Sequence, residues 1–225
     1  MRVSRHLMAV FAGWTVLAAA GFVWAEEPST ADRPVCFWDF DGTLDDRAGK
    51  TADALAAREG QTRFVDASQL PGVIGKAVAL GVQTGDAEYL VASLSKEVAP
   101  GPNYTIEAWV YPTELSAWNR LALRWAAAPN YAYHLALHQG VVSLCHNQSD
   151  GQYVFAEGGR VAAKRWHHLA AVARRNDRQP SESVLTVYLD GRVAGTAPFD
   201  GTIKDQATED LGIGDSAGAP SAASR

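Results

Sequence analysis

Four closely spaced aspartates carry the clearest suggestion of chemistry in this sequence: Asp39, Asp41, Asp45 and Asp46. Asp39 and Asp41 alternate at the end of a short apolar segment. There, one carboxylate could attack phosphorus and the other could transfer a proton, while both hold Mg²⁺. Alternatively, Asp41, Asp45 and Asp46 supply hard oxygen ligands, of which Ca²⁺ takes six to eight. Asp86, in a turn at 85–88, is a further candidate calcium ligand. A plain Asp/Gly surface turn explains the same residues without any metal.

The segment 35–46, VCFWDFDGTLDD, resembles the first motif of haloacid-dehalogenase-like phosphatases, and 214–216 resembles their late acidic motif. The resemblance implies Asp39 as the nucleophile, Asp41 as the acid/base and Mg²⁺ as the cofactor. Such enzymes alternate helices and strands to build a parallel sheet. Residues 104–189 instead predict strand after strand, and no second acidic residue follows 214–216. The phosphatase is therefore an alternative and not the leading hypothesis.

Other catalytic constellations are not evident. Glu107 is the lone charge of an alternating segment at 104–111, whereas retaining glycosidases set two carboxyl groups about 5 Å apart. No clustered acidic motif of that kind occurs in the sequence. His134, His138 and His146 do not have the spacing of a compact metal site. The sequence thus predicts a protein that is not an enzyme.

The elements that must position these residues are predominantly strands. Segments 104–111, 120–125, 131–138 and 141–146 are short, apolar and rich in β-branched and aromatic residues. The segments 166–173 and 184–189 continue the pattern, and Asp190-Gly191 is a turn pair that tolerates positive φ before a returning strand. We expect an antiparallel meander.

Four motifs, in order, resemble the laminin-G-like domains of the concanavalin A-like lectin/glucanase superfamily. They are PGVIGKAVAL at 71–80, YTIEAWVYP at 104–112, RWHHLAAVARR with LTVYLDGRVAGT across 165–196, and LGIG at 211–214. The resemblance implies an all-β, antiparallel β-sandwich of jelly-roll type over residues 35–215. It also implies a recognition module for glycan or protein, in a family that often carries one calcium ion.

The sequence departs from that family at its end. Laminin-G-like domains continue past the LGIG strand into a closing strand that pairs with the first one. Here residues 216–225 are small and polar and predict a disordered tail. Either the chain is a fragment or its first strand is left as an exposed edge.

Aromatic residues near loops are candidates for sugar binding, because their faces can stack on pyranose rings. The candidates are Trp118, Trp125, Tyr131, Tyr133 and Tyr153. Packing in the core is the alternative for each of them. Trp109 and Trp166 lie in the middle of strand motifs, and we expect both in the core.

The N-terminal segment predicts export. Residues 1–25 combine Arg2 and Arg5 with an apolar stretch and a small-residue cleavage site, as in a secretory signal peptide cut after Ala25. An uncleaved membrane anchor is the alternative, and 26–34 is a polar linker. The whole chain carries a net charge of −5, and cleavage removes two arginines. An acidic secreted or periplasmic product does not suit nucleic acid or anionic lipid.

Export also permits a disulfide between Cys36 and Cys145, although two buried thiols fit their apolar contexts as well. The leading functional hypothesis is a secreted, non-catalytic module that binds a glycan or an extracellular or envelope protein. The alternatives are a glycoside hydrolase or lyase of the same superfamily, the phosphatase, and a structural component of the envelope.

Overall fold

The computed structural model describes residues 5–9, 34–48, 56–58, 60–67, 75–81, 85–86, 89–92, 101–125, 131–204 and 211–214. Within these ranges the regular elements are strands, apart from a short 3-10 turn at Pro180–Glu182. None of the described segments forms a helix long and apolar enough to cross a membrane. The predicted tail at 216–225 and nearly all of the linker at 26–34 lie outside the described residues.

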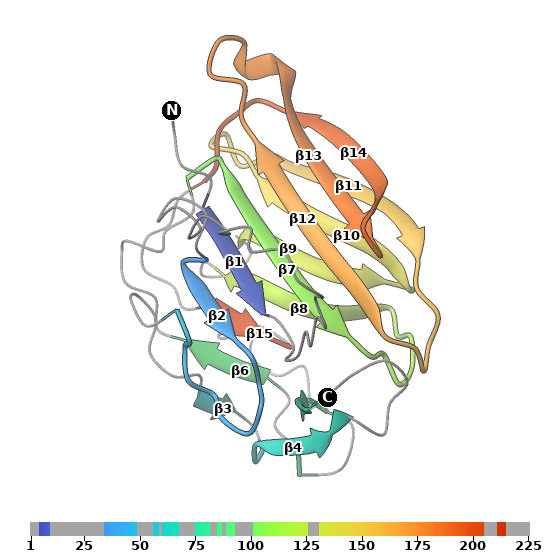
Figure 1. The fold of residues 1–225 in the computed structure, drawn as a ribbon. Coiled ribbons are helices and arrows are strands. Elements are labelled where there is room, and N and C mark those ends of the chain that lie inside the picture. Colours follow the sequence, from blue (N-terminus) through green and yellow to red (C-terminus); the bar gives the residue numbers. More distant parts are fainter. Residues whose placement is uncertain are drawn as a thin grey trace, which may run out of the picture.

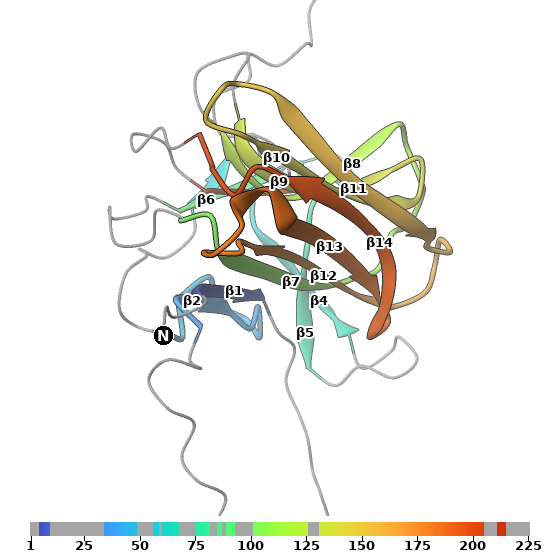
Figure 2. The same ribbon diagram turned by 90° about the horizontal axis from the view of Figure 1, so that it is seen from above.

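Two sheets face each other as the layers of a β-sandwich (Figures 1 and 2). The first sheet has six strands, in the order β14 (Arg192–Phe199), β13 (Ser183–Leu189), β12 (His167–Arg174), β7 (Tyr104–Val110), β1 (Arg5–Ala9) and β2 (Cys36–Trp38). Its pairs are antiparallel except those that β1 makes with β2 and β7, which are parallel.

The second sheet has seven strands. Their order is β11 (Tyr153–Arg160), β10 (Val141–Asn147), β9 (Tyr131–His138), β8 (Trp118–Trp125), β15 (Leu211–Ile213), β6 (Tyr89–Ala92) and β3 (Ala56–Arg58). All its pairs are antiparallel. A small separate hairpin joins β4 (Arg63–Asp66) to β5 (Lys76–Ala79). The prediction of an all-β antiparallel sandwich is confirmed.

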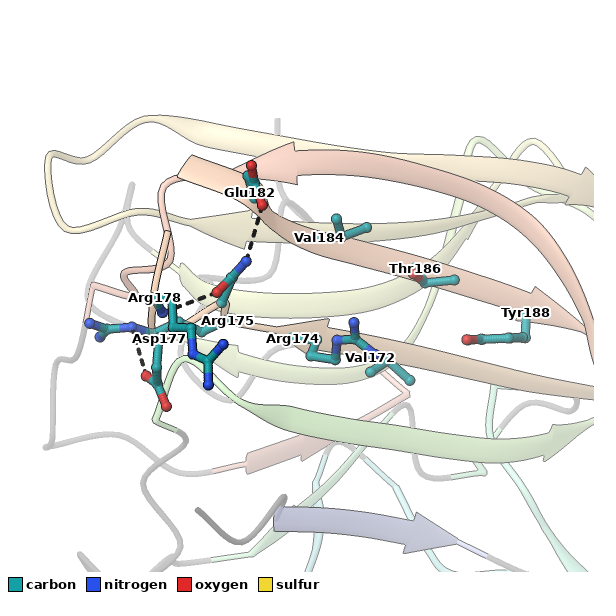
Figure 3. Close-up of a pocket in the computed structure, with 10 residues that line it drawn as sticks. Val172, Arg174, Arg175, Asp177, Arg178, Glu182, Val184, Thr186 and Tyr188 are labelled. Carbon is teal, nitrogen blue, oxygen red and sulfur yellow. Dashed lines mark hydrogen bonds and ion pairs between the residues drawn. The ribbon is translucent and has the colours of Figure 1, made fainter. Parts of the chain in front are cut away.

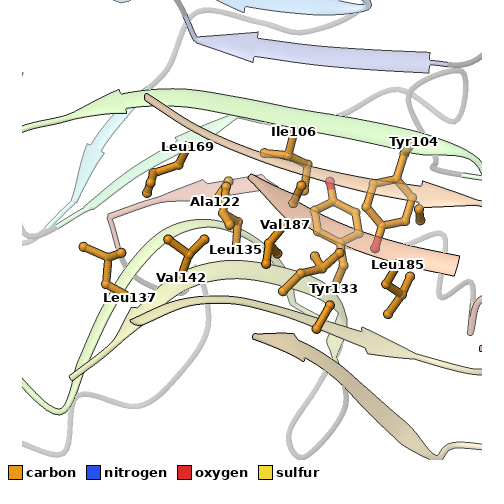
Figure 4. Close-up of a cluster of buried hydrophobic side chains, with 14 of the residues drawn as sticks. Tyr104, Ile106, Ala122, Tyr133, Leu135, Leu137, Val142, Leu169, Leu185 and Val187 are labelled. Carbon is orange, nitrogen blue, oxygen red and sulfur yellow. The ribbon is translucent and has the colours of Figure 1, made fainter. Parts of the chain in front are cut away.

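The core lies between the two sheets and follows the alternation of the strands (Figure 4). Ile106 and Leu169 face it from the six-stranded sheet, and Leu135 and Leu137 face it from the seven-stranded sheet. Because side chains alternate across a strand, residues between these positions point to the outer faces. A second buried cluster, around Trp38 and Leu90, fills the other end of the sandwich.

The predicted hairpin after β13 is confirmed. Asp190 and Gly191 have φ values of 51° and 76°, as a tight turn between twisted strands requires. Asp190 also fixes the turn to β12: its carboxylate accepts hydrogen bonds from the His168 backbone N–H and the His167 ring, both at 2.9 Å. His167 and His168 point to opposite sides of β12, as successive side chains of a strand do.

The two sheets meet closely where β11 lies against β14. A Cβ atom added to Gly158 would overlap the carbonyl of Ala194, and one added to Gly195 would overlap the carbonyl of Glu157. Only glycine lets the two backbones approach this closely. These two glycines therefore allow the two sheets to come into contact along β11 and β14.

The predicted disulfide is not formed. Cys36 and Cys145 are both buried free thiols. Cys36 lies in the second core cluster. Cys145 alternates with the core residues Leu144 and His146 and so faces the outer side of the seven-stranded sheet. The two thiols belong to different sheets, which explains why they do not pair. Burial raises the pKa of the Cys145 thiol to about 12.

Candidate ligand-binding face

The aspartates of segment 39–46 organise a turn. The Asp39 carboxylate accepts hydrogen bonds from Arg47 Nε at 2.9 Å and from the Asp41 backbone N–H at 3.1 Å. Asp46 Oδ1 accepts from the backbone N–H groups of Phe37 and Ala48, at 2.8 and 2.9 Å. These contacts fold the segment back onto β2, which is the role expected of an Asp/Gly turn.

The phosphatase interpretation is wrong. Its motif lies in a chain whose described residues form two mainly antiparallel sheets and no α-helix. The parallel sheet that would present Asp39 and Asp41 at its carboxyl edge is therefore not built. The Asp39 carboxylate is instead held by Arg47.

The predicted calcium ligands do not form one cluster in the described part of the chain. Asp86 is buried and makes a two-pronged ion pair with Arg63, with both N–O distances at 2.7 Å. Asp41 and Asp45 are exposed, and Asp46 is engaged by backbone N–H groups. Among the described residues, no three His, Cys, Asp or Glu side chains make a group that could hold a metal ion. Calcium binding stays a prediction.

The predicted aromatic platform divides between surface and core. Trp118 and Tyr153 are exposed, whereas Tyr133 is buried and stacks on Tyr104 with ring centroids 5.0 Å apart. Tyr133 thus belongs to the core. The backbones of Trp125 and Tyr131 lie in β8 and β9, but their side chains are outside the described part of the structure.

The prediction that Trp109 lies in the core is wrong. Trp109 is 40% exposed on the outer face of the six-stranded sheet, beside His168. Trp109 and the half-buried Glu107 lie on the same side of β7, and both point away from the core that Ile106 faces. Trp166 is half-buried.

The exposed aromatic residues of the seven-stranded sheet lie on its outer side, on a surface that we call the aromatic–histidine face. It comprises Trp118, His134, His138, Tyr153, Phe155 and Glu157. These residues come from β8, β9 and β11. They point away from the core because Leu135 and Leu137, which alternate with the two histidines, point into it.

Trp118 and His138 lie at one end of this face, where β8 begins and β9 ends. They are directly opposed in the β8–β9 register. Their rings stack with centroids 4.1 Å apart and an interplanar angle of 2°. Trp118 is 37% exposed, so the histidine fixes the orientation of an indole ring that solvent still reaches. The arrangement provides a flat apolar surface of defined orientation.

His134 supports the indole from below. Its ring meets Trp118 edge-on at 5.7 Å and lies at a steep angle to Phe155 at 6.5 Å. Burial, with a smaller contribution from Arg120, lowers the pKa of His134 to about 4. The imidazole ring is therefore neutral near pH 7 and packs as an uncharged aromatic ring. At the edge of the face, Glu157 Oε1 lies 3.7 Å from His138 Nδ1.

The sequence reasoning missed Phe155, His138 and Glu157 as members of this face. The alternation of β11 contained the signal, because Tyr153, Phe155 and Glu157 are polar or aromatic on one side and Val154 and Ala156 are apolar on the other. Phe155 is 45% exposed. A comparison of this alternation with that of β9 would have indicated that these side chains share a face with His134 and His138.

A separate groove of about 650 Å³ lies on the outer side of β12 and β13 (Figure 3). Arg174, Arg175 and Arg178 line it together with Val184 and Tyr188. Part of its charge is neutralised locally, since Arg175 Nε lies 3.3 Å from Asp177 Oδ1. The groove is thus a polar surface on the layer opposite the aromatic–histidine face.

The sequence model of the concanavalin A-like lectin/glucanases superfamily, of laminin-G type, matches residues 84–224. That span is more than half of the chain, and the chain belongs to this family. The predicted resemblance is confirmed. Among curated proteins, none matches the sequence significantly.

Solved structures with a similar fold include several binding domains. The binding domain of Paraclostridial Mosquitocidal Protein 1 has a TM-score of 0.56 at 13% identity, covering 77% of this chain and 44% of its own. The receptor binding domain of botulinum neurotoxin D has a TM-score of 0.54 at 11% identity, covering 75% of this chain and 41% of its own. This chain therefore spans less than half the length of either domain.

A third structure matches over most of its own length. Domain 4 of AbnA, a GH43 extracellular arabinanase from Geobacillus stearothermophilus, was solved in complex with arabinotriose. Its TM-score is 0.53 at 18% identity, covering 78% of this chain and 79% of its own. At these identities the three likenesses concern the fold alone.

Proposed function

We propose that this chain is an exported, non-catalytic recognition module that binds a neutral oligosaccharide on the aromatic–histidine face. The observation that carries the proposal is the exposed Trp118 ring, held parallel to His138 at 4.1 Å. One face of a pyranose or furanose ring is lined by C–H groups, which complement the electron-rich face of an aromatic ring. A pre-oriented indole offers such a surface at little cost in conformational entropy.

Polar groups at the rim give the face its means of selecting a ligand. Glu157 can accept hydrogen bonds from sugar hydroxyl groups, and His138 offers a ring nitrogen beside the indole. Phe155 and Tyr153 extend the apolar surface along β11. A short oligosaccharide lying across the outer face from β8 to β11 would meet both kinds of group, as carbohydrate ligands require.

Several considerations favour binding over hydrolysis. Glu157 stands on the seven-stranded sheet and Glu107 on the other, so they are not a pair across one substrate. The family includes both lectins and glucanases, and domain 4 of the arabinanase was solved with arabinotriose bound. Export follows from the predicted signal peptide, and an extracellular or envelope glycan is the ligand class that fits it.

The test is a glycan array followed by calorimetric titration of the best ligand, with arabinotriose included as a probe. We expect Trp118→Ala to weaken binding by roughly tenfold or more, as truncation of an aromatic anchor does. Trp109→Ala is the matched control, because it removes an equally exposed tryptophan from the opposite sheet.

Equal affinity for the two variants would contradict the assignment of this face. Loss of binding in Trp109→Ala alone would move the site to the six-stranded sheet. Failure of the intact protein to retain any glycan on the array would contradict the glycan hypothesis itself.

A further inference from the structure

The arginine-lined groove on the outer side of β12 and β13 has no part in the glycan site proposed above. Side chains that alternate with core residues of the two strands form its floor, and they are Val172, Val184, Thr186 and Tyr188. Figure 3 shows them along the strands, with the arginines gathered where β12 passes into the loop at 175–179. The groove therefore has an uncharged floor and a cationic end.

The cationic end carries a small net charge. Three arginines contribute +3 and two carboxylates contribute −2, a sum of +1, from Arg174, Arg175, Arg178, Asp177 and Glu182. Asp177 Oδ1 lies 3.3 Å from Arg175 Nε. In the part of the chain that the structure describes, no carboxylate forms an ion pair with Arg174 or Arg178, and both residues are exposed. A single negative charge on a ligand would balance this end, whereas a dense polyanion would meet the two carboxylates.

Hydrogen bonds hold the loop that carries Arg175 and Arg178. Asn176 Oδ1 accepts from the Arg178 backbone N–H at 3.0 Å, and Asn176 Nδ2 donates to Glu182 Oε2 at 3.2 Å. The Arg175 backbone N–H donates to Asn103 Oδ1 at 2.8 Å, which ties the loop to the segment before β7. The loop is thus fixed before a ligand arrives, and this lowers the entropic cost of binding.

The groove presents side chains to a ligand, and its two strands have no open edge. β12 pairs with β7 and β13, and β13 pairs with β12 and β14, so their backbone groups are used within the sheet. A peptide that binds by adding a strand therefore has no edge to join here. Planar guanidinium groups instead favour a carboxylate, with which they form paired hydrogen bonds. Along the floor, the Thr186 hydroxyl and the Tyr188 phenol ring suit a body made of hydroxyl and C–H groups.

We propose that this groove is a second binding site, which takes the terminal uronic acid of an oligosaccharide. The uronate carboxylate pairs with Arg174 and Arg178, and the sugar ring lies along the floor towards Tyr188. The groove volume of about 650 Å³ lies within the range of sites for small ligands, about 300 to 1,000 Å³. The site stands on the sheet opposite the aromatic–histidine face, so the two proposals are independent.

The test is a calorimetric titration of the full chain with two uronates. One probe is cellobiouronic acid, which differs from the neutral disaccharide cellobiose by a carboxylate in place of a hydroxymethyl group. The other is digalacturonate, and its dimethyl ester is the neutral counterpart. The variant is the double substitution Arg174→Gln and Arg178→Gln. Arg192→Gln is the matched control, because Arg192 is an exposed arginine at the start of β14 that does not line the groove.

We expect saturable binding of at least one uronate, and binding of its neutral counterpart that is weaker by roughly tenfold or more. The double variant should lose a similar factor, and Arg192→Gln should stay within about twofold of the parent protein. Binding of neither uronate, equal affinity for the neutral counterpart, or unchanged affinity in the double variant would overturn the proposal. Tighter binding of inorganic phosphate or of an acetylated peptide with a free C-terminal carboxylate would also overturn it.

Two further measurements keep the result interpretable. If circular dichroism shows that the double variant is unfolded, Arg178→Gln alone is titrated, since Arg178 is an exposed loop residue. A loss of about threefold or more supports the site, and no loss overturns it. Trp118→Ala is titrated with the same uronate: loss of binding there, with retention in the arginine variants, would move the uronate to the aromatic–histidine face and overturn this proposal alone.

Discussion

At the scale of single residues, His134 makes the candidate face sensitive to pH. Its pKa is lowered to about 4 by burial, against 6.5 for the unfolded chain. Below pH 6.5 the unfolded state therefore binds a proton that the folded state does not, and stability falls as the pH is lowered towards 4. We expect His134→Gln to remove about 2 kcal/mol from the difference in unfolding free energy between pH 7 and pH 4.5.

Urea denaturation at the two pH values measures that difference. His138→Gln, which changes the exposed histidine of the same face, is the control for general effects of acid. If His134→Gln kept the full pH dependence of the parent protein, the assignment of this linkage to His134 would be incorrect.

At the scale of elements, the contact between β11 and β14 depends on two glycines. Gly158 and Gly195 allow the backbones to approach closer than any side chain permits. We expect Gly158→Ala to lower the unfolding free energy by about 3 kcal/mol, because the strands must move apart and disturb the core beneath them. Gly101→Ala is the matched control, since a Cβ atom there meets nothing within 4 Å. Chemical denaturation of both variants checks the prediction, and similar values would refute it.

At the scale of the whole molecule, a buried polar bridge connects the two sheets. Tyr104 on β7 donates its hydroxyl proton to His146 Nδ1 on β10 at 2.8 Å, and His146 Nε2–H donates to the Thr202 carbonyl at 2.7 Å. Both ring nitrogens are thereby satisfied, and burial lowers the pKa of His146. Tyr104→Phe would leave Nδ1 without its donor, at a cost of about 1 to 3 kcal/mol in unfolding free energy.

Tyr188→Phe is the companion variant for that measurement, because Tyr188 lies half-buried on the outer face of the six-stranded sheet. Thermal and urea unfolding should separate the two. An unchanged stability for Tyr104→Phe would mean that the bridge does not hold the layers together.

The sequence alone determined the class of fold and much of its local structure. Alternating apolar residues in 104–110 and 184–189, and the turn pair Asp190-Gly191, are local signals that two-residue periodicity and backbone preference encode directly. The four laminin-G-like motifs specified the family for the same reason, since they record short strands in a fixed order. The turn character of the aspartate-rich segment was likewise readable.

Only the tertiary structure decided which side chains share a surface. Trp118 and Tyr133 both lie in aromatic strand segments, but the pairing of β8 with β9, with irregularities between Arg120 and Ala122 and between Arg124 and Trp125, places one outside and the other in the core. The same long-range pairing separated Cys36 from Cys145 and brought β1 between β7 and β2. Register between distant strands depends on contacts across the sandwich, and a one-residue shift exchanges the two faces, so no local pattern contains it.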